Sequence, residues 1–165
     1  MRKVVTSALL IALICVSTIL IKIPLPVIGY VHLGDVFIFF SCFLLKPKYS
    51  VLVSGVGSAF ADLILGWAIY APATLVIKAL VALFCSLIIY NNPTVIRQII
   101  ALIIGSFIIG LGYFVYEAIL YEVGTAAVNI PFNLAQGAVC GVVSIFLTKA
   151  FERIKPLKEF KDKLL

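Results

Sequence analysis

The sequence predicts an all-α membrane protein with six transmembrane helices and both termini in the cytoplasm. Hydrophobic residues make up 64% of the 165 residues and charged residues only 12%, whereas soluble domains are about half apolar and a quarter charged. Apolar runs of about 18 residues or more, long enough to cross a bilayer as a helix, recur along the chain. Basic residues concentrate in segments that six spans would place on one side. We therefore expect residues 1–165 to form a single integral-membrane domain.

Prolines and short polar stretches divide the chain into these spans. Pro24 and Pro26 follow the first span, and the turn Asn91-Asn92-Pro93 precedes the fifth. The stretch 129–131, Asn-Ile-Pro, is expected to precede the sixth span, because proline disrupts a helix interior. We place the spans at 4–21, 35–45, 51–69, 72–90, 96–121 and 132–154.

The first two spans need separate justification. Arg2 and Lys3 before an apolar run resemble the start of a signal peptide, but the run is long for one and no small-residue cleavage site follows it. A retained first span is favoured. The second span is too short to cross a core of about 30 Å as a helix. Tilt of the neighbouring helices, local thinning of the bilayer or an entry loop packed into the membrane must make up the missing length. We expect residues 29–33 to fold inward as that loop.

The basic residues predict the orientation. Six spans place both termini and the second and fourth loops on one side, and 11 of the 13 lysines and arginines fall there: Arg2, Lys3, Lys46, Lys48, Arg97, Lys149, Arg153, Lys155, Lys158, Lys161 and Lys163. The positive-inside rule makes that side cytoplasmic. The net charge of +6 then reflects topology and contact with anionic lipids, and implies no nucleic-acid surface. The tail 155–165 is expected to be a short amphipathic end at the membrane surface.

Ten polar residues interrupt the spans near the expected outer face. They are His32, Asp35, Asp62, Tyr70, Lys78, Tyr113, Glu117, Asn129, Asn133 and Gln136. Ionisable groups at membrane depth are costly, so they usually mark a binding site or a conduction path. The cytoplasmic halves of the spans are nearly pure hydrocarbon, which favours a one-sided pocket for a polar small molecule.

Asp62 and Lys78 are expected at the same depth. They lie about 10 Å and about 9 Å below the outer ends of the third and fourth spans, at a rise of 1.5 Å per residue. Two opposite charges in the membrane should pair or lose their charge. The sequence therefore predicts a structural ion pair between Asp62 and Lys78, with ligand binding by Lys78 as the alternative.

Glu117 has tyrosines on either side along one helix face. Tyr113 and Tyr121 lie at i−4 and i+4. A carboxylate with flanking aromatic rings suits a planar ring that is partly cationic or donates hydrogen bonds. The alternative is that the tyrosines are ordinary residues of an interfacial aromatic belt.

Three side-chain amides form one helical stripe at the outer start of the sixth span. Asn129, Asn133 and Gln136 lie at i, i+4 and i+7. Amides offer both donors and acceptors, which suits a neutral heterocycle. Helix capping by Asn129 and interhelical hydrogen bonds by the other two are the alternatives.

His32 and Asp35 flank Gly34 at the mouth of the second span. Asp35 is predicted to cap that helix, with ligand contact as the alternative. His32 is the one side chain here that titrates near neutrality without a shift. It is a candidate ligand contact.

Several chemical signatures are absent from the sequence. It contains no P-loop, no HExxH or GxSxG motif and no acidic metal cluster. Its four cysteines lie far apart inside apolar runs and its one histidine cannot complete a zinc site. We therefore expect no enzyme activity, no metal and no cofactor in this chain. Small-xxx-small patterns in the first, third and sixth spans permit close helix packing.

Four stretches carry a resemblance to a known family. Tyr30–Asp35 (YVHLGD), Leu44–Tyr49 (LLKPKY), Gly57–Leu63 (GSAFADL) and Ile69–Thr74 (IYAPAT), together with Lys78, resemble the substrate-binding S-components of energy-coupling factor (ECF) vitamin transporters, in the riboflavin-transporter-like branch. The resemblance covers essentially the whole chain but is looser in the fifth and sixth spans.

The resemblance implies a function and partners. An S-component captures a vitamin outside the cell and joins a module of one transmembrane scaffold subunit and two ATPases. Ala8 and Ala12 match the family's AxxxA docking motif. The residues matching the family's pocket positions are those discussed above. A pocket with one acid, one lysine, several amides and few aromatics suits a small ring, of pyridoxine or hydroxymethylpyrimidine type, better than a large flavin; the single tryptophan, Trp67, does not decide between them.

Two other functional classes remain open at this point. A stand-alone secondary carrier or channel requires a polar path through the whole bilayer, and no inverted repeat is visible in the sequence. A small membrane enzyme requires catalytic acids or metal ligands on the cytoplasmic side, where the chain has none.

Overall fold

The computed structural model describes residues 2–25 and 29–162. Seven helices and one two-stranded hairpin are formed within these ranges. In chain order the elements are α1 (Arg2–Leu20), β1 (Lys22–Pro24), β2 (Tyr30–His32), α2 (Asp35–Leu44), α3 (Pro47–Ile64), α4 (Ala71–Ile89), α5 (Val95–Leu120), α6 (Val123–Arg153) and α7 (Lys155–Asp162).

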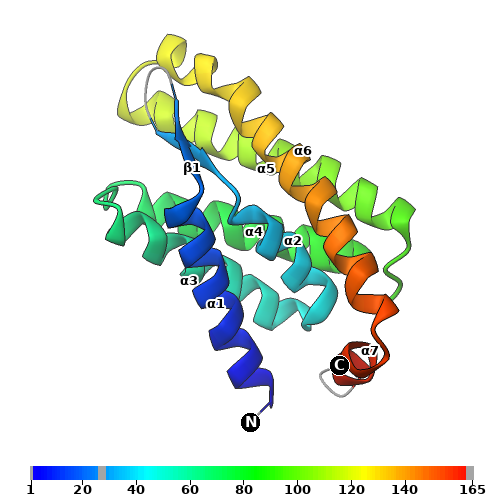
Figure 1. The fold of residues 1–165 in the computed structure, drawn as a ribbon. Coiled ribbons are helices and arrows are strands. Elements are labelled where there is room, and N and C mark those ends of the chain that lie inside the picture. Colours follow the sequence, from blue (N-terminus) through cyan, green and yellow to red (C-terminus); the bar gives the residue numbers. More distant parts are fainter. Residues whose placement is uncertain (1, 26–28, 163–165) are drawn as a thin grey trace.

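The helices form a bundle with two distinct ends (Figure 1). The N terminus, the α2–α3 and α4–α5 connections and α7 lie at one end, here named the terminal end. The β-hairpin and the α3–α4 and α5–α6 connections lie at the other, named the hairpin end. Of the basic residues predicted to share one side, all but Lys163, which lies outside the described residues, belong to segments at the terminal end.

The described helices follow most of the predicted spans. α1, α2, α4 and α5 match their spans to within two residues at each end. α3 begins earlier than predicted, at Pro47, because proline is favoured in the first turn of a helix, and it ends at Ile64 rather than near 69. Within the described ranges, α1, α4, α5 and α6 are long and apolar enough to cross a membrane, and α2 is a shorter apolar helix.

The start of α6 was predicted wrongly. The helix begins at Val123 rather than near 132 and continues through Pro131. Proline removes one backbone donor, but membrane helices tolerate it where neighbouring helices and small local adjustments satisfy the freed backbone groups. The Asn-Ile-Pro stretch therefore belongs to the helix interior, which moves Asn129 from a cap to a side position.

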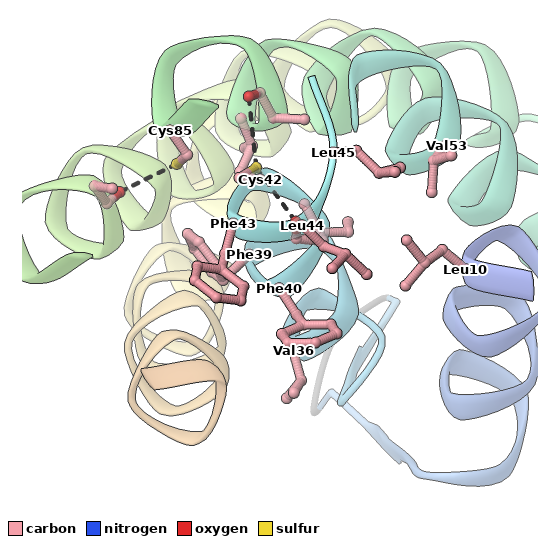
Figure 2. Packing of buried hydrophobic residues seen from close by; sticks show 14 of the residues in the cluster. Leu10, Val36, Phe39, Phe40, Cys42, Phe43, Leu44, Leu45, Val53 and Cys85 are labelled. Atoms are coloured by element: carbon pink, nitrogen blue, oxygen red, sulfur yellow. Dashed lines mark hydrogen bonds between the residues drawn. The ribbon is translucent and has the colours of Figure 1, made fainter. Parts of the chain in front are cut away.

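Helix α2 is the centre of the bundle. Nine of its ten residues are buried, and it packs against α1, α3, α4 and α6. Figure 2 shows Phe39, Phe40 and Phe43 of α2 among apolar side chains of the surrounding helices. Because it is enclosed by other helices, α2 does not need the full length of a lipid-facing span.

Other segments cover both ends of α2. At the hairpin end, the backbone N–H of Leu33 donates to the carbonyl of Ile21, which ties the hairpin to α1. At the terminal end, the ammonium group of Lys161 in α7 lies 3.5 Å from the ring centroid of Phe43. The ring of Phe151 in α6 packs edge-on against Phe43. Residues 155–162 of the predicted amphipathic tail thus form a helix, α7, that covers the end of α2 at the terminal end of the bundle; residues 163–165 lie outside the described residues.

The predicted inward-folding loop is the β-hairpin. β1 and β2 pair antiparallel, with Lys22 opposite His32 and Pro24 opposite Tyr30. Gly29 has φ +83°, a conformation that favours glycine. A side chain at Gly34 would place its Cβ 2.0 Å from the hydroxyl of Thr18 in α1. Glycine at this position therefore lets the hairpin lie directly against the helix.

Candidate ligand-binding site

A small polar cavity lies beneath the hairpin. It is lined by Leu25, Gly29, Tyr30, His32, Asp62, Trp67, Tyr70, Thr74, Tyr113, Glu117, Asn133 and Gln136. Its volume is about 30 Å³, whereas ligand pockets usually measure about 300–1,000 Å³. Binding of a vitamin-sized molecule therefore requires the hairpin or the lining side chains to move outward.

The fully buried ion pair differs from the predicted one. The ammonium group of Lys78 donates to both carboxylate oxygens of Asp35 at 2.8 Å, and both side chains are essentially inaccessible. The amide of Gln136 donates to Asp35 Oδ2 at 2.6 Å. The predicted Asp62–Lys78 pair was therefore wrong, since α2 lies at the centre of the bundle and its Asp35 takes Lys78.

Asp35 also has a different role from the predicted cap. The residue before α2 is Gly34, and no side-chain hydrogen bond caps this helix. The Asp35 carboxylate instead joins three helices, because Lys78 comes from α4 and Gln136 from α6. This network holds the core beside the cavity and leaves neither Asp35 nor Lys78 in the cavity lining.

Asp62 faces the cavity and the hairpin. The hydroxyl of Tyr30 in β2 donates to Asp62 Oδ1 at 2.6 Å. Burial, followed by the charge of Asp62, raises the pKa of Tyr30 well above its usual value, so this hydroxyl keeps its proton. The Thr74 hydroxyl of α4 is a second neutral donor beside the Asp62 carboxylate. The contact with Tyr30 fastens the hairpin to α3.

Glu117 is the second carboxylate of the cavity. The amide of Asn129 donates to Glu117 Oε2 at 2.9 Å, and the hydroxyl of Tyr70 donates to Oε1 at 3.4 Å. The capping alternative for Asn129 was wrong, because Asn129 lies inside α6, whose preceding residue is Glu122. Asn129 orients Glu117 without lining the cavity itself.

His32 is held in one tautomer by its neighbours. The backbone N–H of Gly34 donates to His32 Nδ1 at 3.0 Å, and the Thr18 hydroxyl lies 3.2 Å from the same atom. Nδ1 therefore accepts, and the proton of the neutral ring lies on Nε2. Burial lowers the pKa of His32 to about 4, against the opposing effect of Asp35. The ring is uncharged at neutral pH.

His32 and Gln136 separate the polar cavity from a second, apolar one. The backbone N–H of His32 donates to Gln136 Oε1 at 2.9 Å. The second cavity measures about 220 Å³, and apolar residues of the α1 end, the hairpin and α6 form the rest of its lining. It contains no carboxylate and is less suited to a polar ligand, although it is larger.

Aromatic rings form a chain around the polar cavity. The ring centroids of Tyr30 and Trp67 are 6.0 Å apart, and those of Trp67 and Tyr70 are 5.5 Å apart. Tyr70 in turn packs edge-on against Tyr116. The hydroxyls of Thr74 and Tyr113 share a hydrogen bond of 3.0 Å. These contacts connect the hairpin, the α3–α4 connection, α4 and α5.

The structure places most of the predicted site residues around the cavity. His32, Tyr70, Tyr113, Glu117, Asn133 and Gln136 line it. Asp35, Lys78 and Asn129 lie behind them and hold lining residues in place. Sequence reasoning did not single out Tyr30, Trp67 and Thr74 as lining residues. Thr74 had a usable signal, because it precedes Lys78 by one helical turn, whereas Tyr30 and Trp67 lie in connections whose path the sequence does not reveal.

Ala8 and Ala12 lie far from this cavity, on the exposed face of α1. Val5, Leu9 and Val16 are exposed on the same helix. The other small-xxx-small patterns are used inside the bundle. A Cβ on Gly57 would lie 3.1 Å from the carbonyl oxygen of Ile11 in α1. A Cβ on Gly137 would lie 2.6 Å from Ser106 Oγ in α5. The α1 pattern is therefore the one that remains uncovered among the described residues.

Comparison with known proteins identifies the family. The helical bundle with a buried polar cavity near one end is that of a multi-pass integral-membrane protein of the plasma membrane. The family model for the S component of ECF-type riboflavin transporters matches residues 1–153, and the chain belongs to this family. The family consists of transporter subunits and not of enzymes.

Two individual proteins are also similar to the chain. An uncharacterised protein of Pyrococcus woesei is 31% identical over 131 residues, which cover 79% of this chain and 87% of that protein. The solved structure of the S component of a bacterial ECF transporter matches with a TM-score of 0.78 and 23% identity. The matched region covers 92% of this chain and 96% of the solved chain. At that identity the match supports the fold.

Proposed function

We propose that this chain is the substrate-binding subunit of an ECF-type vitamin importer and captures a small ring vitamin or precursor near the extracellular face. Pyridoxine-type vitamers and hydroxymethylpyrimidine are the favoured substrates. The observation that carries the proposal is the one-sided position of the buried acids, lysine and histidine. Apart from Lys161 of α7, the buried aspartate, glutamate, lysine and histidine side chains among the described residues cluster at or next to the cavity under the hairpin.

The orientation follows from the charges at the two ends. The described basic residues concentrate at the terminal end, which the positive-inside rule assigns to the cytoplasm. The hairpin end then faces outward, and the cavity takes substrate from outside. The terminal half holds the hydrophobic core around α2, and its buried polar groups among the described residues are mainly serine and threonine hydroxyls. The buried acids do not continue from the cavity into this half, which argues against a stand-alone carrier or channel.

The size of the cavity favours a small substrate. A volume of about 30 Å³ holds about one water molecule, so each added ring requires further displacement of the lining. A single ring can be admitted by outward movement of Tyr30 and the hairpin. A tricyclic flavin would also require the chain of rings through Trp67 and Tyr70 to separate.

Delivery into the cell depends on a partner module. The exposed apolar face of α1 around Ala8 and Ala12 allows close approach of another helix, since small residues permit backbone contact in membranes. We assign this face to the transmembrane scaffold subunit. ATP is hydrolysed by two partner ATPases, because this sequence contains no P-loop.

Calorimetric titration of the purified protein with a panel of B vitamins and their ring precursors tests the proposal. Trp67, the one tryptophan of the chain, lines the cavity, so its fluorescence gives an independent signal. We expect one single-ring compound to bind at a one-to-one ratio and to change that fluorescence. Folded protein that binds no member of the panel would contradict the proposal.

A further inference from the structure

We infer that the substrate carries a positive charge, on a ring nitrogen or on an amino substituent. This inference rests on the proposed function and narrows the chemical class of its substrate. It follows from the charges that line the cavity and from those already neutralised behind it. The favoured vitamers include rings that can carry such a charge.

The cavity contains two carboxylates and no cation. Asp62 and Glu117 both line it, and its twelve described lining residues include no lysine or arginine. The one buried cation nearby, Lys78, is already neutralised by Asp35 in a two-pronged contact. His32 is neutral because Nδ1 accepts from the backbone of Gly34. The lining therefore has an excess of two negative charges when both acids are ionised.

Burial disfavours the charge of both acids, and the hydrogen-bond donors beside them act in the opposite direction. Tyr30 donates to Asp62 and Asn129 donates to Glu117, at 2.6 Å and 2.9 Å. Donors aimed at a carboxylate stabilise its charge. Asp62 is only 5% exposed, and the hydroxyls beside its carboxylate, those of Tyr30 and Thr74, are neutral donors. Neutral donors do not cancel the charge of a buried carboxylate, whereas a positively charged donor on the substrate would.

The aromatic lining favours the same class of substrate. Tyr30, Trp67, Tyr70 and Tyr113 all line the cavity. Their rings present negative faces to a cation, and tryptophan is the strongest partner of this kind. A cationic ring can therefore lie against an aromatic face while its charge or amino group meets the carboxylates. An anionic vitamin would be repelled, and a neutral one would leave both charges uncompensated.

Paired ligands that differ mainly in charge test this inference on the unmodified protein. Suitable pairs are nicotinamide with N1-methylnicotinamide, and 3-pyridylmethanol with its N-methylpyridinium derivative. Hydroxymethylpyrimidine and thiamine extend the series, and riboflavin and nicotinate serve as neutral and anionic probes. Affinities are measured by calorimetry and by Trp67 fluorescence at constant pH and salt. We expect the cation of each pair to bind at least about tenfold more tightly.

Variants locate the charge that is responsible. Asp62→Asn and Glu117→Gln should each lower the affinity for the cation more than that for the neutral member, and so reduce the preference for the cation by about tenfold. Glu122→Gln removes a carboxylate that is not part of the cavity lining and should retain the full preference. Thermal unfolding of each variant confirms that it is folded, and the comparison of ligand pairs on the unmodified protein requires no variant.

The outcomes separate this inference from the proposed function. Equal or tighter binding of the neutral members, or tightest binding of riboflavin, would overturn the inference and leave vitamin capture intact. A cation preference that survives both Asp62→Asn and Glu117→Gln would overturn the assignment to these carboxylates. Absence of binding by every probe would remove the proposed function and the inference together.

Discussion

Replacement of Lys78 by methionine tests the central electrostatic contact of the bundle. The change keeps the length of the side chain and removes its charge, leaving Asp35 buried with Gln136 as its remaining side-chain donor. Lys78 and Asp35 are both inaccessible and meet through two contacts of 2.8 Å. Breaking a buried pair of this kind costs about 3–5 kcal/mol. At about 2–4 °C per kcal/mol for a protein of this size, Lys78→Met should lower Tm by about 6–20 °C.

Two double variants show which carboxylate is the partner. Asp35→Asn combined with Lys78→Met removes both charges and should recover most of the lost stability, because buried pairs are often replaceable by neutral groups. Asp62→Asn combined with Lys78→Met should recover none of it, since Asp62 bonds to Tyr30 instead. The Tm of the unmodified protein, of the single variant and of the two double variants is measured by thermal unfolding in detergent. A stable single variant, or rescue by the Asp62 change, would refute the assignment of the pair.

Four further predictions follow from the site and the proposed topology. Glu117→Gln should weaken binding of the best ligand by about 1.5–3 kcal/mol, the value of a hydrogen bond to a charged group, and unchanged calorimetric affinity would move the site away from α5. Ala8→Trp and Ala12→Trp, on the exposed face of α1, should block uptake in cells while purified protein keeps its affinity; equal loss of both would contradict a docking role. Because burial lowers the pKa of His32 to about 4 from about 6.5 when unfolded, the unfolded chain binds more protons between these values. The free energy of unfolding should then fall by about 2 kcal/mol from pH 6.5 to pH 5. An equal fall over the same pH range in a His32→Gln variant would contradict the assignment of this effect to His32. The cysteine of an Asn92→Cys variant should not react with a membrane-impermeant thiol reagent in intact cells. Labelling of that cysteine would show that the orientation is the opposite of the proposed one.

The order and positions of the helices were largely predictable because hydropathy and proline report directly on membrane helices. The inward-folding loop expected at 29–33 lies largely in the hairpin, whose second strand ends at His32, but enclosure by other helices explains the short length of α2. Pro131 misled the prediction of α6, because a helix packed among others can accept a proline that an exposed helix would not.

The partners of the buried charges could not be predicted from depth alone. Counting residues from the helix ends placed Asp62 and Lys78 level with each other, but the direction of each side chain depends on how the helices are rotated. The central position of α2, which brings Asp35 to Lys78, arises from packing of all the helices. The predicted stripe of three amides has different roles along its length for the same reason. Asn133 lines the cavity, whereas the Asn129 amide donates a hydrogen bond to Glu117.

The most direct test of the account is an experimental structure with the tightest-binding vitamin or precursor. We predict that a single ring lies under a displaced hairpin, with a cationic or amino group between Asp62 and Glu117 and with Trp67 beside the ring. The Lys78–Asp35 pair should be unchanged. Ligand density in the apolar cavity beyond His32 and Gln136, with the polar cavity still closed, would contradict the account.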